Sequence, residues 1–252
     1  MSILPPGTPP DPPERPLKIK ICGLTEPGNV AEVSALEPDF AGYIFVKGSR
    51  RFVGDHPDPA LFSTPGENTA RVGVFVNEPV DGVRKIFETC LLDLVQLHGS
   101  ESPAYCQQLV DAGIPVIKVI HAGLLQDVRH KHGGGRQKGR VAGLPDHYLG
   151  VAHYLLFDSG KSGSGGSGQP FDWSMLGEQS IPLPFLLGGG IGPNDAPRIR
   201  QLGHSALFGV DLNSRFEGSP GIKDASLLRP FMEEIRKPLS RKQSKSNDEI
   251  SS

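Results

Sequence analysis

The stretch PFLLGGGIGPNDAPRIRQLGHSALFGVDLNS, residues 184–214, decides the fold. It holds two short apolar runs, PFLLGG (184–189) and SALFGVD (205–211), and a helical pattern over 193–202 separates them. Short runs that are apolar throughout and end at Gly or Asp are typical of strands buried on both faces. Two such strands with a helix between them predict a parallel pair joined by a crossover. Pro193 could fill the first turn of that helix, where a missing N–H costs nothing.

Six similar runs come earlier in the chain: KIKIC (18–22), FAGYIFV (40–46), ARVGVFV (70–76), LDLVQL (92–97), PVIKVI (115–120) and HYLLFD (153–158). The clearer of the other helical patterns lie over 27–36, 79–90, 101–112 and 224–237. Eight strands that alternate with helices predict an α/β protein with a closed (β/α)8 TIM barrel, a single domain over residues 17–238. A doubly wound open sheet is the main alternative, because a strand count made from sequence carries error.

Three segments fall outside this pattern. Residues 1–16 are rich in proline and predict a disordered arm, and the polar residues 239–252 predict a disordered tail. Residues 121–150 stand where the fifth helix is expected but are rich in Gly, His and Arg, so we expect a loop or partly formed helix that replaces or extends it. In this segment His121, His130 and His132 could be argued as metal ligands. No carboxylate or cysteine stands at ligand spacing from them, so a solvated basic loop is the preferred interpretation.

The composition excludes several classes of function. The formal net charge is −2 and 37% of residues are hydrophobic, so the chain can form a core but carries no basic field for nucleic acid or membrane lipid. No apolar run approaches the about 20 residues that a membrane helix needs. The three cysteines cannot all pair and form no C-x-x-C motif, which indicates reduced thiols in a cytoplasmic protein. Cys90 and Cys106 fall in predicted helices and are expected to be packing residues.

The loops after the last two predicted strands suit a phosphate group. In an eight-fold barrel, function lies at the carboxyl ends of the strands, and the loops after strands seven and eight often bind phosphate. Gly189 and Gly190 stand just before a helix start, where glycine lets the backbone approach an anion. Asn213 and Ser214 follow the eighth strand and could begin a short extra helix. These four residues are the predicted phosphate site, with ordinary glycine-rich turns as the alternative.

Two reactive side chains stand at other strand ends. Cys22 ends the first predicted strand and Asp158 ends the sixth. Taken singly, such a cysteine can be a small buried hydrophobe and such an aspartate can be a helix cap. At the rim of a phosphate-binding barrel, we interpret the two as a base and an acid. His98 and Asp211 also stand at strand ends and are expected to contact the substrate.

A glycine- and serine-rich segment, GKSGSGGSGQP (160–170), directly follows the strand that ends at Asp158. Its composition is that of a flexible linker. It runs into FDW (171–173), however, where Asp172 could cap a helix. A lid that closes over a substrate would have the same composition and position, and we expect one here.

Several motifs, taken together, resemble one family. They are KICGLT (20–25), SRRFV (49–53), VGVFVNE (72–78), VQLHG (95–99), LLFD (155–158), GSGGSGQPFDW (163–173), LLGGGIGP (186–193) and GVDLNSRFEGSPGIKD (209–224). Their order and spacing are similar to those of the phosphoribosylanthranilate isomerases, over about residues 18–236. KICGLT, QLHG and the GGSG…FDW block are together quite specific. The chain departs from the family in the 121–150 insertion, in its arms, and at Asn213, where many relatives have Ser.

This resemblance implies an Amadori rearrangement of N-(5'-phosphoribosyl)anthranilate to 1-(2-carboxyphenylamino)-1-deoxyribulose 5-phosphate in tryptophan biosynthesis, without metal or cofactor. It implies Cys22 as general base, Asp158 as general acid, and Arg51 as the group that meets the anthranilate carboxylate. Such chemistry calls for an acid with a raised pKa and a thiol with a lowered one. The implied partner is a small-molecule phosphosugar, with no nucleic acid or membrane partner, and a monomer is favoured over a homodimer.

Three alternatives stay open. A histidine-pathway sugar isomerase performs the same rearrangement on a related barrel, but it uses a carboxylate where this chain has Cys22. A non-catalytic phosphosugar-binding barrel or scaffold subunit would predict loss of the acid or the base. The chain could also be one module of a fused pathway protein, although its Met1 start and polar arm favour a free-standing enzyme.

Overall fold

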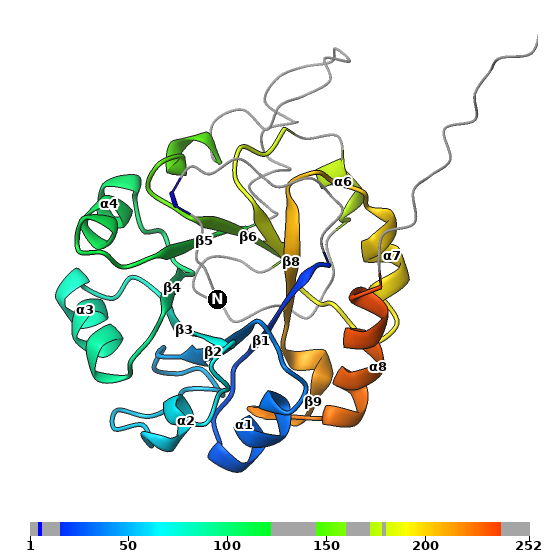
Figure 1. Ribbon diagram of the computed structural model, residues 1–252. Helices are drawn as coiled ribbons and strands as arrows, with labels where there is room; N and C mark the ends of the chain where they lie inside the picture. Colours follow the sequence, from blue (N-terminus) through cyan, green and yellow to red (C-terminus); the bar gives the residue numbers. More distant parts are fainter. Residues whose placement is uncertain (1–4, 7–15, 122–144, 160–171, 178–179, 238–252) are drawn as a thin grey trace, which may run out of the picture.

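The computed structural model describes residues 5–6, 16–121, 145–159, 172–177 and 180–237. Within them, eight parallel strands close into a barrel in chain order, and β8 pairs with β1 (Figure 1). The strands are β1 (Lys18–Cys22), β2 (Phe40–Ile44), β3 (Ala70–Phe75), β4 (Leu94–Leu97), β5 (Val116–His121), β6 (Tyr154–Asp158), β7 (Phe185–Leu187) and β8 (Leu207–Leu212). The predicted (β/α)8 barrel is therefore confirmed, and the open sheet is excluded.

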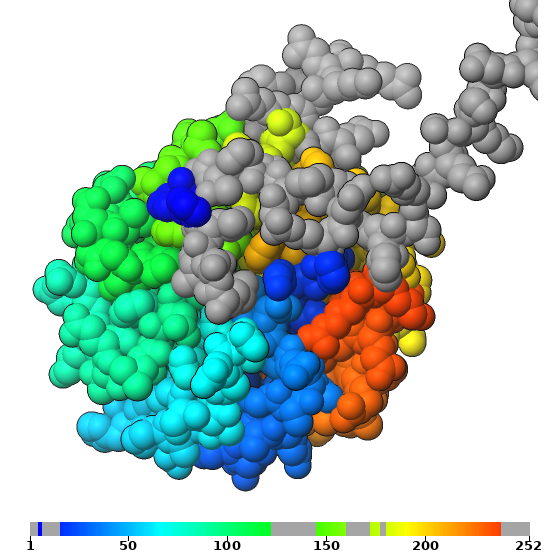
Figure 2. Space-filling view, in the orientation of Figure 1, coloured from blue at the N-terminus to red at the C-terminus, as the bar shows by residue number. Residues whose placement is uncertain are grey.

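Helices form an outer ring around these strands (Figure 1). They are α1 (Pro27–Ser34), α2 (Ala60–Ser63), α3 (Val80–Thr89), α4 (Pro103–Asp111), α6 (Ser174–Gly177), α7 (Ala196–Gln201) and α8 (Ala225–Ile235). The other described elements are the 3-10 helices η1 (Asp146–Tyr148) and η2 (Ser214–Phe216) and a small ribbon of β9 (Glu217–Ser219) and β10 (Ile222–Lys223). Figure 2 shows the ring closing, with the orange and red end of the barrel beside its blue beginning.

The predicted helix over 193–202 is present as α7, but it begins later than expected. Its first residue is Ala196, so Pro193 lies before the helix, and Pro197 takes a first-turn position instead. The Asp195 carboxylate accepts a hydrogen bond from the backbone N–H of Gly192 at 2.7 Å and closes a turn there. This turn delays the helix by three residues and leaves the loop free to face the barrel mouth.

The segments set apart in the sequence are described only in part. The predicted arm and tail lie outside the described residues, apart from Pro5, Pro6 and Pro16. In the 121–150 segment, β5 extends to His121 and η1 forms at the far end, whereas residues 122–144 lie outside the described part. No helix within the described residues is both long enough and apolar enough to cross a membrane.

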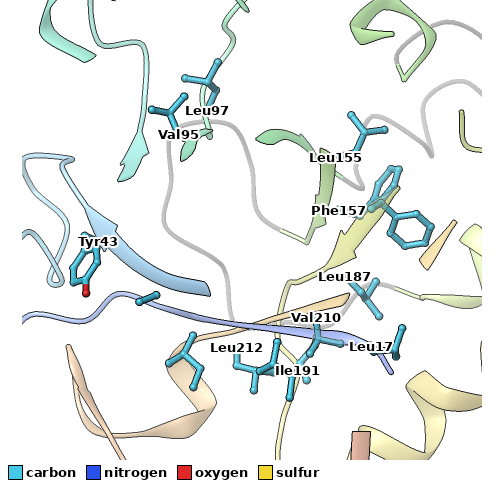
Figure 3. Close-up of a cluster of buried hydrophobic side chains, with 14 of the residues drawn as sticks. Leu17, Tyr43, Val95, Leu97, Leu155, Phe157, Leu187, Ile191, Val210 and Leu212 are labelled. Carbon is cyan, nitrogen blue, oxygen red and sulfur yellow. The ribbon is translucent and has the colours of Figure 1, made fainter. Parts of the chain in front are cut away.

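The side chains of the strands alternate between two cores. On β5, Val116 and Ile120 pack in the larger core, whereas Ile117 and Val119 pack in the smaller one. Because successive residues of a strand point to opposite faces, one core lies between strands and helices and the other lies inside the barrel. Figure 3 shows part of the larger core, with labelled side chains such as Tyr43, Leu155 and Val210 on strands all round the ring.

The inner core fills one end of the barrel. It consists of apolar residues from β2 to β7, with Phe208 of β8 packed against them: Phe40, Ala70, Val72, Leu94, Ile117, Val119, Tyr154, Leu156 and Leu186. The next inward positions along the strands, toward their carboxyl ends, include Cys22, Gln96, His121, Asp158 and Asp211. The change from apolar to polar along one face places the candidate site at the carboxyl end of the barrel.

Candidate active site

One cavity opens at the carboxyl ends of the strands, and its volume is about 950 Å³ with the open mouth included. Its lining includes every residue predicted from the sequence to act on or bind the substrate: Cys22, Arg51, His98, Asp158, Gly189, Gly190, Asp211, Asn213 and Ser214. Apolar side chains such as Val74 and Ile191 complete its wall. Residues of seven strands and their loops therefore converge on one site, as the barrel interpretation requires.

Cys22 faces this cavity from the last position of β1 and is only 3% exposed. Lys20, two residues earlier on the same face of the strand, is completely buried. Its ammonium donates a hydrogen bond to Oδ1 of Asp211 at 2.8 Å, across the β1–β8 pairing. A methyl group added at Gly42 would lie 2.9 Å from Sγ of Cys22 and 3.1 Å from Nζ of Lys20, so thiol and ammonium face the same small space.

The charges around Cys22 do not lower its pKa in the ligand-free protein. Burial raises the pKa of the thiol, and the Asp211 carboxylate adds to this rise. The ammonium groups of Lys20 and Lys223 act in the opposite direction but do not outweigh the burial, so the pKa lies above its ordinary value. The expectation of a lowered thiol pKa is therefore wrong for this state.

Asp158 ends β6 beside two histidines from the neighbouring strands. Its Oδ2 lies 3.1 Å from Nε2 of His98, which follows β4. His121, at the end of β5, is the register partner of Asp158, and its ring centroid lies 5.3 Å from that of His98. In the sequence, His121 stood out only as part of the inserted segment, and nothing there placed it next to the predicted acid.

The histidines also reverse the expectation for the Asp158 pKa. Burial alone would raise the pKa of this carboxyl group. The contact with His98, together with the charges of His98 and His121, outweighs the burial and holds the pKa below its ordinary value. Burial and the neighbouring His98 likewise lower the pKa of His121. Asp158 is therefore a carboxylate at neutral pH, and the predicted raised pKa is wrong.

Arg51 reaches the cavity from the loop after β2, where it is held by a carboxylate. Its Nε and Nη2 donate hydrogen bonds to the two carboxylate oxygens of Glu217, at 2.8 and 2.6 Å. Glu217 also accepts a hydrogen bond from the buried Lys223, at 2.5 Å, and Lys223 donates to Oδ1 of Asn213 at 2.8 Å. Glu217 and Lys223 were not predicted as site residues. Both lie within the quoted motif GVDLNSRFEGSPGIKD (209–224), but nothing in the sequence indicated that the β9–β10 ribbon would bring them to Arg51.

The glycines of the predicted phosphate loop have backbone conformations that few other residues adopt. Gly189 and Gly190 both lie in the left-handed region, with φ of 77° and 80°. A methyl group at Gly189 would lie 2.4 Å from the backbone nitrogen of Ser159. The predicted short helix after β8 is present as η2, with Asn213 at its N-cap and Ser214 as its first residue. Both loops thus bring backbone to the same side of the cavity.

Other predictions near the site have mixed outcomes. Asp172 accepts a hydrogen bond from the backbone N–H of Ser174, the first residue of α6, at 3.0 Å, so it lies one residue before the N-cap position that was predicted for it. Cys90 and Cys106 are both buried, as expected of packing residues. The predicted lid, residues 160–170, and two of the inserted histidines, His130 and His132, lie outside the described residues.

Comparison with known proteins connects this site to one family. The family model for N-(5'-phosphoribosyl)anthranilate (PRA) isomerase matches residues 19–234. The enzyme of that name from Parabacteroides distasonis is 40% identical over 222 residues, which is 87% of this chain and 94% of that protein. The one from Phocaeicola vulgatus is 35% identical and covers 88% of this chain and 98% of its own length.

Solved structures agree with the sequence comparison. Phosphoribosylanthranilate isomerase from Thermus thermophilus superposes with a TM-score of 0.69 at 27% identity, covering 87% of this chain and 98% of that one. The enzyme from Thermotoga maritima superposes with a TM-score of 0.70 at 25% identity and the same coverage. The family model, the relatives and the fold all lead to one assignment: the chain belongs to the N-(5'-phosphoribosyl)anthranilate isomerase family.

Proposed function

We propose that this chain isomerises N-(5'-phosphoribosyl)anthranilate to 1-(2-carboxyphenylamino)-1-deoxyribulose 5-phosphate in tryptophan biosynthesis, with Cys22 as general base and Asp158 as general acid. The observation that carries the proposal is that a thiol and a carboxylate line one cavity together with a glycine-rich loop. Membership of the isomerase family supports the reaction. No step of it requires an electron acceptor, because the aldose and ketose forms are at the same oxidation level.

The acid acts first. Protonated Asp158 gives its proton to the ring oxygen of the ribose, the bond from that oxygen to C1' breaks, and the nitrogen lone pair forms an iminium ion with C1'. The Cys22 thiolate then removes the proton from C2', whose bonding electrons move toward the iminium nitrogen and give a neutral enolamine. The enolamine then tautomerises to the ketone: its C2' hydroxyl proton passes to solvent and C1' takes a proton from solvent. Proton exchange with solvent returns Asp158 and Cys22 to their starting forms.

Charges on the substrate offset the unfavourable pKa values of Cys22 and Asp158. The substrate brings a phosphate and a carboxylate into the cavity, and nearby negative charge raises the pKa of Asp158 toward the value an acid needs. The iminium ion then forms a positive charge beside Cys22, which lowers the pKa of the thiol at the moment when a base is required. The pair is therefore activated by the reacting molecule rather than in advance.

Lys20 is a positioning residue in this scheme. It is not expected to contact the substrate, because it is completely buried and its ammonium is hydrogen-bonded to Asp211. Its ammonium lowers the cost of the Cys22 thiolate, since it is the first of the charges that oppose the burial of the thiol. Without Lys20, a thiolate in this buried position would face the Asp211 carboxylate with less compensation.

The two ends of the substrate are anchored by different loops. The phosphate lies against the backbone of Gly189 and Gly190 and against the start of η2 at Ser214, with Asn213 beside it. The anthranilate carboxylate meets Arg51, whose Nη1 donates to no other described residue and whose orientation Glu217 fixes. His98 and Asp211 line the space between, where they contact the ribose. Anchoring at both ends holds C2' against the thiol.

A substrate comparison tests the proposal. The purified protein should consume phosphoribosylanthranilate, followed by loss of its fluorescence, and should leave the histidine-pathway aminoaldose phosphate unchanged. The reason is that only the first substrate offers a carboxylate to Arg51. Turnover of the histidine-pathway substrate alone would replace the proposal with the rival isomerase. Binding of both without turnover of either would support a non-catalytic phosphosugar-binding barrel.

We propose further that the enzyme acts as a monomer in the cytoplasm. The predicted acid, base and binding residues all line one cavity of a single barrel, so one chain supplies them all. Leu91 and Leu149 are the only large hydrophobic residues in the described ranges that are mostly exposed, and they offer no broad apolar patch. A cytoplasmic location suits a base that is a free thiol. Light scattering on the purified protein tests the first point, since a dimer mass would contradict it.

A further inference from the structure

We propose that His98, His121 and Asp158 form a Zn²⁺ site at the carboxyl ends of β4, β5 and β6, and that zinc bound there inhibits the enzyme. The site itself stands on the geometry of these three side chains. Its inhibitory effect rests on the proposed function, because it requires that Asp158 take part in the reaction.

The barrel brings the three residues together from adjacent strands. One potential ligand atom of each lies within 4.8 Å of the others. Two of these residues, His121 and Asp158, are register partners on β5 and β6. His98 occupies the corresponding inward position after β4, and its Nε2 is 3.1 Å from Oδ2 of Asp158. Three neighbouring strands thus bring two imidazoles and one carboxylate together: His98 and Asp158 line the cavity, and His121 lies buried beside them.

His121 interacts with its neighbours His98 and Asp158, through ring contact with the first and charge with both. Its side chain is buried, with the residue only 5% exposed, yet neither ring nitrogen has a hydrogen-bond partner within the described residues. Buried polar groups nearly always have a partner, because an unpaired one loses its bonds to water without replacement. An imidazole with an unpaired nitrogen beside a second imidazole and a carboxylate is most simply explained as a ligand.

The donor set suits zinc. Two imidazole nitrogens and one carboxylate oxygen are a combination that zinc accepts in sites that keep a fourth position open, with ligand distances of about 2.0–2.2 Å. Donors around a tetrahedral ion at such distances lie about 3.4 Å apart. Nε2 of His98 and Oδ2 of Asp158, at 3.1 Å, already have nearly this spacing, so the remaining approach, from at most 4.8 Å, falls to His121. Rotation of the side chains supplies that movement without a change in the barrel.

A bound zinc ion would stop the reaction at its first step. The ion occupies an oxygen of Asp158 and keeps the carboxyl group ionised, so the group cannot protonate the ribose ring. It also lies in the cavity where the substrate binds, since His98 and Asp158 both line that cavity. Inhibition should therefore be relieved by saturating substrate or by a chelator.

The test is a zinc titration of the full-length, chelator-treated protein by calorimetry. Wild type should bind one Zn²⁺ in this site, and His121→Gln and Asp158→Asn should each weaken binding by about 10- to 100-fold, at least the effect of losing an outer-shell partner. His56→Gln is the matched control, because His56 is exposed and lies outside the cluster. Absence of binding, or equal affinity in wild type and His121→Gln, would overturn the site.

Cobalt gives a second readout that needs no variant. Co²⁺ in the site should show visible ligand-field bands without a sulfur-to-cobalt charge-transfer band, because no ligand is a thiolate. A charge-transfer band that vanishes in Cys22→Ser would place the ion on Cys22 and overturn the proposal. Zinc binding that survives in His121→Gln but is lost when His130 and His132 are both replaced by Gln would place the ion on the inserted segment and would also overturn the proposal.

Turnover separates this inference from the proposed function. Zinc should inhibit wild type at the concentrations at which calorimetry shows binding. At the same zinc concentration, the factor by which zinc lowers the turnover of His121→Gln should be about tenfold smaller than the factor for wild type. Zinc binding without inhibition would overturn the inhibitory role and leave the site. Failure of the zinc-free protein to consume phosphoribosylanthranilate would overturn the proposed function, while calorimetry and the cobalt spectrum still decide the site.

Discussion

The Arg51 guanidinium and the Glu217 carboxylate form a two-bond pair at the barrel mouth, with Nε and Nη2 of the arginine at 2.8 and 2.6 Å from the two oxygens. Both side chains are largely buried, at 13% and 4% exposure. The same carboxylate forms an ion pair with the buried ammonium of Lys223. Glu217 therefore fixes the orientation of the Arg51 guanidinium at the cavity. Substitution of either residue tests the role of this pair.

Arg51→Lys should lower kcat/KM for phosphoribosylanthranilate by about 10- to 100-fold, because a charge-assisted hydrogen bond contributes about 1.5–3 kcal/mol. A lysine offers a point charge and cannot hold a carboxylate with a planar fork. Arg50→Lys is the control, since Arg50 is exposed and does not line the cavity. Steady-state kinetics of the two variants check this, and equal small effects would return Arg51 to the protein surface.

Glu217→Gln should lower the stability at neutral pH by about 3–5 kcal/mol, because it leaves a buried ammonium without its partner. Thermal unfolding should show this as a fall in Tm of roughly 10 °C. Asp55→Asn is the control: its ion pair with Lys47 lies in solvent, at 62% and 78% exposure, and such pairs contribute little. A similar Tm for both variants would contradict the buried network.

The same substitution predicts a pH dependence. Although burial opposes it, the contacts with Arg51 and Lys223 hold the pKa of Glu217 below its ordinary value of 4.5 in the folded protein. A depressed folded-state pKa contributes stability that is fully present above the unfolded-state value and is lost as the pH falls through the folded-state value. The difference in stability between wild type and Glu217→Gln should therefore shrink in acid, below about pH 4.5. Denaturant unfolding at several pH values measures it, and a difference that stays constant down to about pH 3, well below the unfolded-state pKa, would contradict the pairing.

Lys20→Met should slow the alkylation of Cys22 by iodoacetamide by about tenfold or more at about pH 8–9, because loss of the ammonium raises the pKa of the thiol and alkylation needs the thiolate. Mass spectrometry of the Cys22 peptide measures the rate, with Cys90 in the same digest as an internal reference. Lys18→Met is the control, since Lys18 lies on the same strand but pairs with Asp39 at the other end. Unchanged alkylation in Lys20→Met would remove the proposed positioning role.

Gly189→Ala should weaken inhibition by inorganic phosphate by about tenfold or more, because the added methyl group meets the Ser159 backbone and strains a left-handed residue. Gly113→Ala is the control. It carries the same backbone strain, with φ of 76°, but has open space around it and lies outside the cavity. Competition kinetics distinguish the two, and equal phosphate inhibition in both variants would argue against a phosphate site at this loop.

The barrel could be predicted because local chemistry and topology agree. Apolar runs such as KIKIC (18–22) can be buried on both faces only in a covered parallel sheet, and the observed β1 has the same bounds. The candidate residues also converge, since the carboxyl ends of all strands meet at one rim. Position at a strand end was therefore enough to find Cys22, Asp158 and Asp211 without knowledge of their contacts.

The electrostatics of the site could not be predicted in the same way. The pKa of Asp158 depends on His98 and His121, which come from other strands. Their separations from Asp158 along the sequence match no motif, so the sequence did not indicate that they are neighbours. The carboxylate beside His121 is that of Asp158, on the next strand of the barrel, so the inserted segment by itself did not reveal it. The role of Lys20 was also not predicted, because a lysine in an apolar run is normally exposed, and only the closed barrel turns it inward to Asp211.

The central claim is that Cys22 and Asp158 are the base and the acid of an isomerase, and turnover of phosphoribosylanthranilate by three purified proteins tests it most directly. Wild type should consume the fluorescent substrate, and Cys22→Ala and Asp158→Asn should each lose about 10²- to 10⁴-fold in kcat, the usual effect of removing a positioned acid or base. Binding of a product analogue should change little, because neither group anchors the phosphate or the carboxylate. Near wild-type turnover by Cys22→Ala would contradict the account.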